Sequence, residues 1–370
     1  MVNNVYSAGF SALRKNFLLI VLLAASLGLA IGLRQPLWRL PAFVDWDTIV
    51  TLSGLLLITT GIKESGLFYL AAYRISRRID NERLLALFLV TVSATLAAFL
   101  TNDIALFIIV PLTLSLQQIS ENDYSRIIIF EAIAVNVGSS LTPIGNPQNI
   151  FLWHRWGISF PGFIKEMAPL VLIMSAWLLV MTFLSFSSAK IKSADRHHPV
   201  VDRGLFCLSA VLLIAFVFSV ELDCGRYFLI IVFFSLLFAR KSVILKTDWG
   251  LILLFMVIFI DLNLIFQIKA MQRLPALLNF KHSATLFLSG AVMSQAISNV
   301  PSAVLLANYS SRFKMIAYGV NIGGNGLLIS SFANLIALRF IEKRSRYLLF
   351  HACSLPYFVI TLISAYGLLT

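Results

Sequence analysis

Three short polar clusters interrupt apolar stretches of this 370-residue sequence. The first consists of Thr101, Asn102 and Asp103 and includes a carboxyl group. An ionised carboxylate costs roughly 3 kcal/mol at the centre of a bilayer, so an acid in such a position normally has a functional partner. Asp103 could bind a cation when ionised, or it could carry a proton. The structural alternative is a cap that accepts hydrogen bonds from free N–H groups at a turn.

The second cluster runs from Asn136 to Asn149 and reads NVGSSLTPIGNPQN. Two prolines prevent a regular helix, because proline removes a backbone donor and clashes with the preceding turn. Unwound backbone is tolerated at membrane depth only where it is buried in protein or lines a watered cavity. Its carbonyls could bind a cation there, and the N-terminus of the following half-helix could bind an anion. The candidate binding residues are Asn136, Gly138, Ser139, Ser140, Thr142, Pro143, Gly145, Asn146 and Asn149.

The third cluster and a second helix break form another copy of the same features. The cluster gives the candidate binding residues Ser298, Asn299, Pro301 and Ser302. The break gives the candidates Asn321, Gly323, Gly324, Asn325, Ser330 and Asn334. Val300 stands where Asp103 stands in the first copy, so the copies are chemically unequal. We expect any titratable step in the first copy and substrate selection in both.

Two further acids, Glu131 and Asp261, lie in apolar segments. Together with Asp103 they could relay protons across the membrane. Each also has a structural interpretation. Glu131 could pair with Arg126, and Asp261 could pair with a neighbouring Asn or with Lys269.

The composition places these clusters in a membrane protein. The chain is 59% hydrophobic and 12% charged, which leaves too few polar residues to cover a soluble globule of this size. Its three cysteines are far apart and form no CxxC pair, so neither a disulfide framework nor a thiolate metal site is predicted. No cofactor and no resident metal are expected, although the protein could transport a cation such as sodium.

Charge-poor segments predict an all-helical polytopic protein with nine crossings. These lie near 17–33, 46–62, 127–152 (interrupted), 167–189, 204–220, 226–239, 249–268, 315–338 (interrupted) and 347–369. The regions 84–116 and 282–309 carry polar residues at mid-length and are predicted to be re-entrant hairpins. The basic segment 64–83 is predicted to be a helix at the membrane surface, with a plain basic loop as the alternative.

The distribution of basic residues predicts the orientation. With the N-terminus inside, 19 of the 29 Lys and Arg residues fall on the cytoplasmic side. The positive-inside rule then places the N-terminus in the cytoplasm and the C-terminus outside. The net charge of +12 is therefore a topology signal, and no nucleic-acid partner is expected.

The clusters belong to an internal repeat. Residues 134–138 (AVNVG) match residues 319–323 (GVNIG), and at the same offset Asn149 matches Asn334. An Asp-Trp pair begins the first span of each copy, at Asp45 and Asp248. Three spans separate the copies. Because an odd number of crossings lies between them, the second copy enters the membrane from the opposite side and is inverted relative to the first. We expect one transmembrane transporter domain over 1–370, with inverted repeats at 45–155 and 247–342, linking spans at 160–240 and a final span at 347–369.

The sequence resembles the ion transporter superfamily. The resemblance lies in the motifs at Thr101 to Asp103, Asn136 to Asn149 and Ser298 to Pro301. Within it, the similarity is greatest to the branch of arsenite permeases, NhaD sodium/proton antiporters and CitM-type citrate transporters. In length and wording, the sequence is most similar to the YbiR-like bacterial inner-membrane proteins. The resemblance implies re-entrant hairpins, a substrate site between two hairpin tips and two broken helices, and elevator-type alternating access. One departure is notable, because dicarboxylate carriers of this superfamily have Ser-Asn-Thr at both tips.

The sequence therefore predicts an ion-coupled secondary transporter of a small inorganic or organic anion or oxyacid in a bacterial inner membrane. Protons or sodium would drive it by antiport or symport. An NhaD-like sodium/proton antiporter and a passive anion channel are alternatives. An intramembrane enzyme is not expected, since neither an HExxH nor a GxSxG motif occurs. The sequence leaves the oligomeric state open, with a homodimer among the options.

Overall fold

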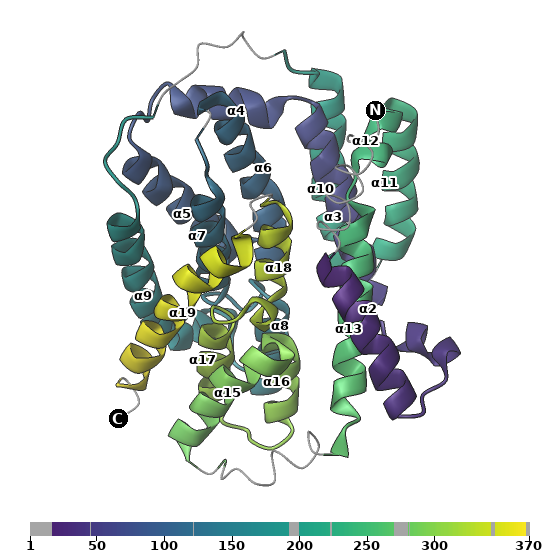
Figure 1. Ribbon diagram of the computed structural model, residues 1–370, viewed down its shortest axis with the longest axis vertical. Coiled ribbons are helices and arrows are strands. Elements are labelled where there is room, and N and C mark those ends of the chain that lie inside the picture. Colours follow the sequence, from purple (N-terminus) through teal and green to yellow (C-terminus); the bar gives the residue numbers. More distant parts are fainter. Residues whose placement is uncertain are drawn as a thin grey trace. The chain divides into compact units, whose positions relative to one another are not determined.

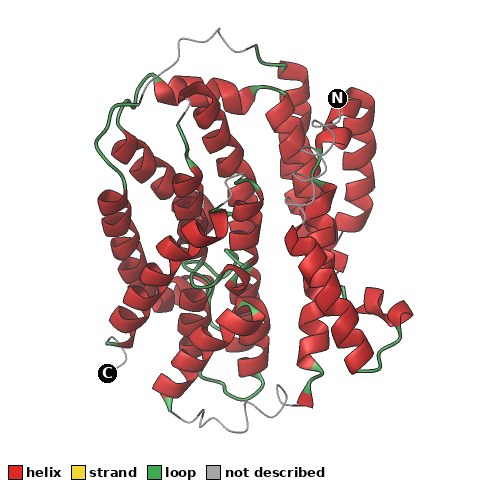
Figure 2. Cartoon of the chain, viewed as in Figure 1, coloured by secondary structure: helices red, strands yellow, loops and turns green. Residues whose placement is uncertain are grey.

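The computed structural model describes residues 17–44, 46–120, 122–191, 200–222, 224–269, 280, 282–341 and 345–367. In these residues the regular structure is helical, apart from one isolated antiparallel bridge between Asn81 and Lys190 (Figure 2). The predicted all-helical class is confirmed. Five described helices are long and apolar enough to cross a membrane, or up to seven if each of two bent pairs is one span. Asp45, Arg14 and Lys15 lie outside the described residues.

The chain forms two compact units, each assembled from two separate stretches of sequence. Unit 1 comprises Met1–Leu67 and Val201–Leu277, and unit 2 comprises Phe68–Val200 and Leu278–Thr370. The boundary between the two units falls at the same place in both repeats. The first span of each repeat belongs to unit 1, whereas the hairpin and the broken helix of each belong to unit 2. All polar clusters of both copies therefore lie in one unit.

Unit 1 contains apolar helices that pack through small residues. Its described helices are α2 (Phe17–Gly32), η1 (Leu37–Phe43), α3 (Trp46–Glu64), α10 (Arg203–Glu221), α11 (Gly225–Ala239), α12 (Lys241–Lys246) and α13 (Trp249–Phe266). Helix α3 packs against α10 and α11, and α2 packs against α13. A Cβ on Gly54 of α3 would lie 2.1 Å from the Phe216 ring, and one on Gly61 would lie 2.5 Å from the Ser209 hydroxyl. Any larger residue at either position would displace the neighbouring side chain, so the two glycines permit this close packing of the helices.

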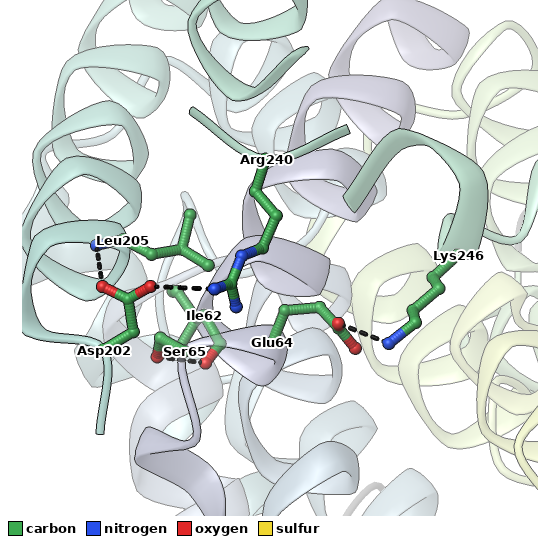
Figure 3. Close-up of polar contacts among 7 residues, drawn as sticks. All are labelled: Ile62, Glu64, Ser65, Asp202, Leu205, Arg240 and Lys246. Carbon is green, nitrogen blue, oxygen red and sulfur yellow. Dashed lines mark hydrogen bonds and ion pairs between the residues drawn. The ribbon is translucent and has the colours of Figure 1, made fainter. Parts of the chain in front are cut away.

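Polar contacts join the helix ends at one end of unit 1 (Figure 3). The carboxylate of Asp202 caps the first turn of α10 and pairs with Arg240 at 3.4 Å, and its backbone N–H donates to the Ser65 carbonyl at 2.9 Å. Glu64, the last residue of α3, pairs with Lys246 of α12 at 2.5 Å. Exposed ion pairs contribute about 0–1 kcal/mol each, so these contacts fix local geometry more than they stabilise the unit.

Unit 2 contains both hairpins and both broken helices. Its helices are α4 (Leu67–Ser76), α5 (Glu82–Phe99), α6 (Asn102–Ser120), α7 (Ser125–Ser139), α8 (Pro147–Trp156), α9 (Phe160–Ser185), α15 (Ser283–Ile297), α16 (Asn299–Ala307), α17 (Phe313–Gly323), η3 (Leu328–Ser330), α18 (Phe332–Arg339) and α19 (Arg346–Tyr366). Hairpin α5–α6 opens toward the top of Figure 1 and hairpin α15–α16 toward the bottom. Their opposite directions are those of inverted repeats.

The second hairpin is too short to cross a bilayer. Helix α16 has 9 residues, which is about 14 Å of helix against a hydrocarbon core of about 30 Å. Helices α5 and α6 have 18 and 19 residues, so length alone would let the first hairpin cross. However, its tip meets the break between α7 and α8, where the Asn102 N–H donates to the Gly145 carbonyl at 2.9 Å. The first hairpin therefore also turns at the depth of a helix break.

The segment between α4 and α5 pairs with the end of α9. The Glu82 N–H donates to the Ala189 carbonyl at 3.1 Å, and the Ile191 N–H donates to the Asp80 carbonyl at 2.7 Å. Helix α4 lies within the segment expected to be helical at 64–83, and its location at a membrane surface stays a prediction. The backbone pairing marks a polar boundary where α9 ends and α5 begins.

Candidate functional site

Asn149 holds the break between α7 and α8. Its Nδ2 donates to the carbonyls of Ser139, Ser140 and Thr142 at 3.2, 3.3 and 3.1 Å. Asn146 caps α8, because its side chain accepts the Asn149 N–H at 2.9 Å. The unwound backbone is thus satisfied by protein groups, as its burial requires.

Asn334 holds the break between α17 and α18 in the same manner. Its Nδ2 donates to the carbonyls of Gly324 at 2.9 Å and Leu327 at 3.4 Å. These residues correspond to Ser139 and Thr142 at the repeat offset of 185 residues. The repeat therefore extends from sequence to individual hydrogen bonds.

A reciprocal pair of amides joins the two breaks. Asn136 Nδ2 donates to Asn334 Oδ1 at 3.0 Å, and Asn321 Nδ2 donates to Asn149 Oδ1 at 2.8 Å. Each bond is the counterpart of the other at the repeat offset. All four side chains are at most 3% exposed. A fully satisfied buried network of this kind specifies a single arrangement of the two breaks.

The residues at the starts of α8 and α18 extend this network. Asn146 Nδ2 donates to Asn321 Oδ1 at 3.1 Å, and Ser331 Oγ donates to Asn136 Oδ1 at 2.9 Å. Asn146 and Ser331 are again counterparts. Ser140 Oγ also donates to Asn321 Oδ1, at 3.1 Å. The start of α8 is therefore linked to the end of α17, and the start of α18 is linked to α7.

Each hairpin tip contacts the break of its own copy. The first does so through the Asn102 N–H and the Gly145 carbonyl, and the second through Ser298 Oγ and the Ser330 carbonyl at 3.4 Å. Gly145 and Ser330 correspond at the repeat offset. Ser298 has a φ of +72°, an uncommon conformation for a residue with a side chain. The tips and the breaks thus form one continuous region.

Four helix N-termini lie in this region, those of α6, α8, α16 and α18. Helix α6 packs against α18, and α8 packs against α16, so each hairpin also contacts the broken helix of the other copy. Helix N-termini carry free N–H groups and a partial positive charge. The arrangement can bind an anion without a basic side chain.

Three side-chain oxygens of this region are buried and have no hydrogen-bond partner among the described residues. They are Asp103 Oδ1, Gln148 Oε1 and Asn325 Oδ1. Buried polar atoms are normally paired, so such exceptions require an explanation. All three oxygens can ligate a cation or accept a hydrogen bond from an ordered water, and the Asp103 carboxylate can also bind a proton.

The two further acids have partners that the sequence did not indicate. Glu131 is fully buried, and its Oε1 accepts the Thr113 hydroxyl, whereas Arg126 donates to the Ser185 carbonyl at 3.0 Å. In unit 1, Asp261 accepts the Ser26 hydroxyl at 2.6 Å, in place of the expected Asn or Lys269. Both expected pairings were wrong, because partners on α6 and α2 are distant in sequence.

The predicted binding residues occupy the tips and breaks of unit 2, whereas Glu131 lies within α7 and Asp261 lies in unit 1; all of their roles stay predictions. Gly138 and Gly323 are contact points, since a Cβ would lie 1.8 Å from the Ala94 carbonyl oxygen and 2.6 Å from Ser294 Cβ, respectively. Sequence reasoning missed Gln148, whose Nε2 donates to Asn321 Oδ1 at 3.3 Å, and also Ser331 and Gln295. The repeat offset could have found Ser331, because it pairs this residue with Asn146.

A family model described as a citrate transporter (CitMHS) matches residues 10–312. The chain belongs to the citrate transporter family. It is 41% identical to the inner membrane protein YbiR of Escherichia coli over 360 residues, which cover 95% of each chain. It is 33% identical to an uncharacterized transporter of Methanocaldococcus jannaschii over 86% of this chain and 88% of that one.

Membership of the citrate transporter family confirms the predicted superfamily resemblance and a multi-pass membrane transporter. The family description and the Methanocaldococcus jannaschii relative both carry the name transporter, which is consistent with the expectation that the chain is not an enzyme. Among solved structures, the YdaH transporter of Alcanivorax borkumensis is similar with a TM-score of 0.44 and 14% identity, covering 97% of each chain.

Proposed function

We propose that this chain is an ion-coupled secondary active transporter of a small anion or oxyacid. The observation that carries the proposal is that four helix N-termini lie close to Asp103, a partly buried acid whose buried Oδ1 has no partner among the described residues. The N-termini attract an anion, and the carboxylate attracts a cation. A cation on Asp103 would remove the repulsion between this carboxylate and an anionic substrate. Binding of the two solutes is thereby coupled.

The coupling ion in this proposal is a proton or sodium. A proton would bind Asp103 directly. Sodium would use Asp103 together with amide and carbonyl oxygens of the breaks, as unwound helices do in other secondary transporters. The unpartnered oxygens of Gln148 and Asn325 support the second option.

The substrate proposed is small. The family description names citrate, but the tips here are Thr-Asn-Asp and Ser-Asn-Val, and the described tips and breaks contain no Lys or Arg. A tricarboxylate would leave its charges without counterions in such a site. A small anion or oxyacid can be held by N–H, amide and hydroxyl groups alone.

Elevator-type access is part of the proposal. All candidate binding residues belong to unit 2. A site built within one unit can be carried across the membrane as a whole. Sequential exposure to the two sides would then require no rupture of the amide network.

Driven uptake into proteoliposomes tests the role of Asp103. We expect Asp103→Asn to fold normally, because the amide has the same shape, and to lose pH- or sodium-driven uptake by about tenfold or more. Asp47→Asn is the control, since Asp47 pairs with exposed Arg226 in unit 1. Full driven uptake by Asp103→Asn would exclude Asp103 as the coupling site.

A sodium/proton antiporter is the second candidate, and it is favoured by the partly buried Asp103 and the fully buried Glu131. In this case no anion is carried, and Asp103 exchanges sodium for protons. Expression in an antiporter-deficient bacterium at high sodium and alkaline pH separates the two candidates. Restored growth that is lost in Asp103→Asn would support antiport, and anion uptake without such growth would support the leading candidate.

The proposed orientation has the N-terminus inside and the C-terminus outside an inner membrane. It rests on the bias of basic residues described above. Alkaline phosphatase fused after the C-terminus is active only in the periplasm. We expect activity from this fusion, and an inactive but well-expressed fusion would reverse the orientation.

A further inference from the structure

An apolar groove of about 350 Å³ lies between α5 and α9 in unit 2. Its walls are Leu87, Leu179, Val180, Phe183 and Leu184. The four residues of α9 are spaced so that they lie on one helix face. Phe183 is 51% exposed and Leu184 is 75% exposed. No candidate residue of the transport site lines this groove.

Arg83 lies at one end of the groove. It precedes Leu87 by one turn of α5, and its guanidinium carbon lies 4.3 Å from the centroid of the Phe183 ring. Its Nε donates to the Phe186 carbonyl at 2.8 Å. The guanidinium is therefore held in place against a wall of the groove.

A second guanidinium, that of Arg126, binds the backbone carbonyl of the residue that precedes Phe186. Arg126 Nη1 donates to the Ser185 carbonyl at 3.0 Å. Among the described residues, neither Arg83 nor Arg126 lies within ion-pair distance of a carboxylate. This end also carries the bridge between Asn81 and Lys190, where α5 begins and α9 ends. In a bilayer, a polar boundary where a spanning helix ends and a re-entrant hairpin begins lies at the level of the lipid headgroups.

We infer that this groove binds an anionic phospholipid. One acyl chain lies along Leu179, Phe183 and Leu87, and the phosphate binds the guanidinium groups of Arg83 and Arg126. Basic pockets beside apolar transmembrane surfaces recognise anionic headgroups in this way. A zwitterionic lipid binds less well, because its ammonium group is repelled by the same two cations.

Lipid retention by the purified full-length protein tests the inference. Native mass spectrometry compares phosphatidylglycerol with phosphatidylethanolamine of identical acyl chains. We expect about fivefold preferential retention of phosphatidylglycerol, and loss of this preference in Arg83→Gln. Arg78→Gln removes the same charge from an exposed position of the same unit, where no groove residue lies. This control should retain phosphatidylglycerol like the wild type.

Val180→Trp tests the groove independently, since it fills an exposed position and leaves both arginines intact. We expect it to reduce retention of phosphatidylglycerol with an unchanged thermal unfolding temperature. Equal retention of the two lipids by the wild type would overturn the inference, and so would normal retention by Val180→Trp. Competition by free glycerol 3-phosphate would show a site for the headgroup anion alone and would also overturn it.

Discussion

The two helix breaks of unit 2 have nearly the same hydrogen bonds but different chemistry. In both, an Asn side chain holds the unwound carbonyls of its own break and accepts a bond from the other copy. The positions with unpartnered oxygens do not match in this way. Asp103 corresponds to Val300 and Gln148 to Ala333. The Asn residues that hold the breaks together are duplicated, whereas Asp103 and Gln148 have no polar counterpart.

The fully buried Glu131 extends this contrast, because Ile316 occupies its position in the second copy. The first copy therefore carries two acids that the second copy lacks. Duplicated residues should matter for stability, and unduplicated ones for transport. The variants below test this division.

Removal of the most connected amide should have the largest effect. Asn321→Ala deprives Gln148 Nε2 and Asn149 Oδ1 of their hydrogen-bond partner, and each buried group left unpaired costs about 1–3 kcal/mol. We expect a loss of about 3 kcal/mol in the free energy of unfolding, together with loss of uptake. Thermal unfolding in detergent measures the first effect. Asn308→Ala, at an exposed position after α16, is the control, and equal stability of the two variants would refute the structural role of the network.

Substitution of the two equivalent glycines by alanine should destabilise the two copies to different extents. In Gly138→Ala the new atom would lie 1.8 Å from the backbone oxygen of Ala94, so the helices must move apart. In Gly323→Ala the nearest atoms, at 2.6 and 2.7 Å, belong to the Ser294 side chain, and the Ala291 oxygen lies at 3.0 Å. We expect destabilisation by about 3 kcal/mol in the first variant and about 1 kcal/mol in the second.

Gly28→Ala is the control for this pair, because nothing lies within 4 Å of the new Cβ. Alanine favours a helix by up to about 1 kcal/mol relative to glycine, so this variant should unfold at the same or a higher temperature. Equal unfolding temperatures for Gly138→Ala and Gly323→Ala would show that the two helix contacts are equally tolerant.

Sequence predicted the hairpins and breaks because Asn, Gly and Pro are conspicuous within apolar segments. The offset between Asn136 and Asn321 also predicted that the copies correspond. It could not predict that Asn136 bonds to Asn334, since a hydrogen-bond partner depends on how distant helices pack. The same limit explains the missed partner of Glu131. Nor does any local pattern show that the first span of each repeat joins a different unit from its hairpin.

Gln148 should affect transport more than stability. Its only hydrogen bond among the described residues is the long one to Asn321, and its Oε1 has no partner there. We expect Gln148→Ala to raise the KM for uptake about fivefold and to change the free energy of unfolding by less than about 1 kcal/mol. Uptake at graded substrate concentrations measures the KM. A large loss of stability with an unchanged KM would instead assign Gln148 to the amide network.

Glu131→Gln should have the smallest effect on stability. The amide has the shape of a neutral carboxyl group, and its oxygen can still accept the Thr113 hydroxyl. We expect the free energy of unfolding to change by less than about 1 kcal/mol, whereas Glu131→Ala should lose about 3 kcal/mol through a cavity and an unpaired hydroxyl. If Glu131 relays protons, Glu131→Gln must change the pH profile of uptake while the protein remains folded. An unchanged profile would leave Asp103 as the acid through which the first copy differs in function from the second.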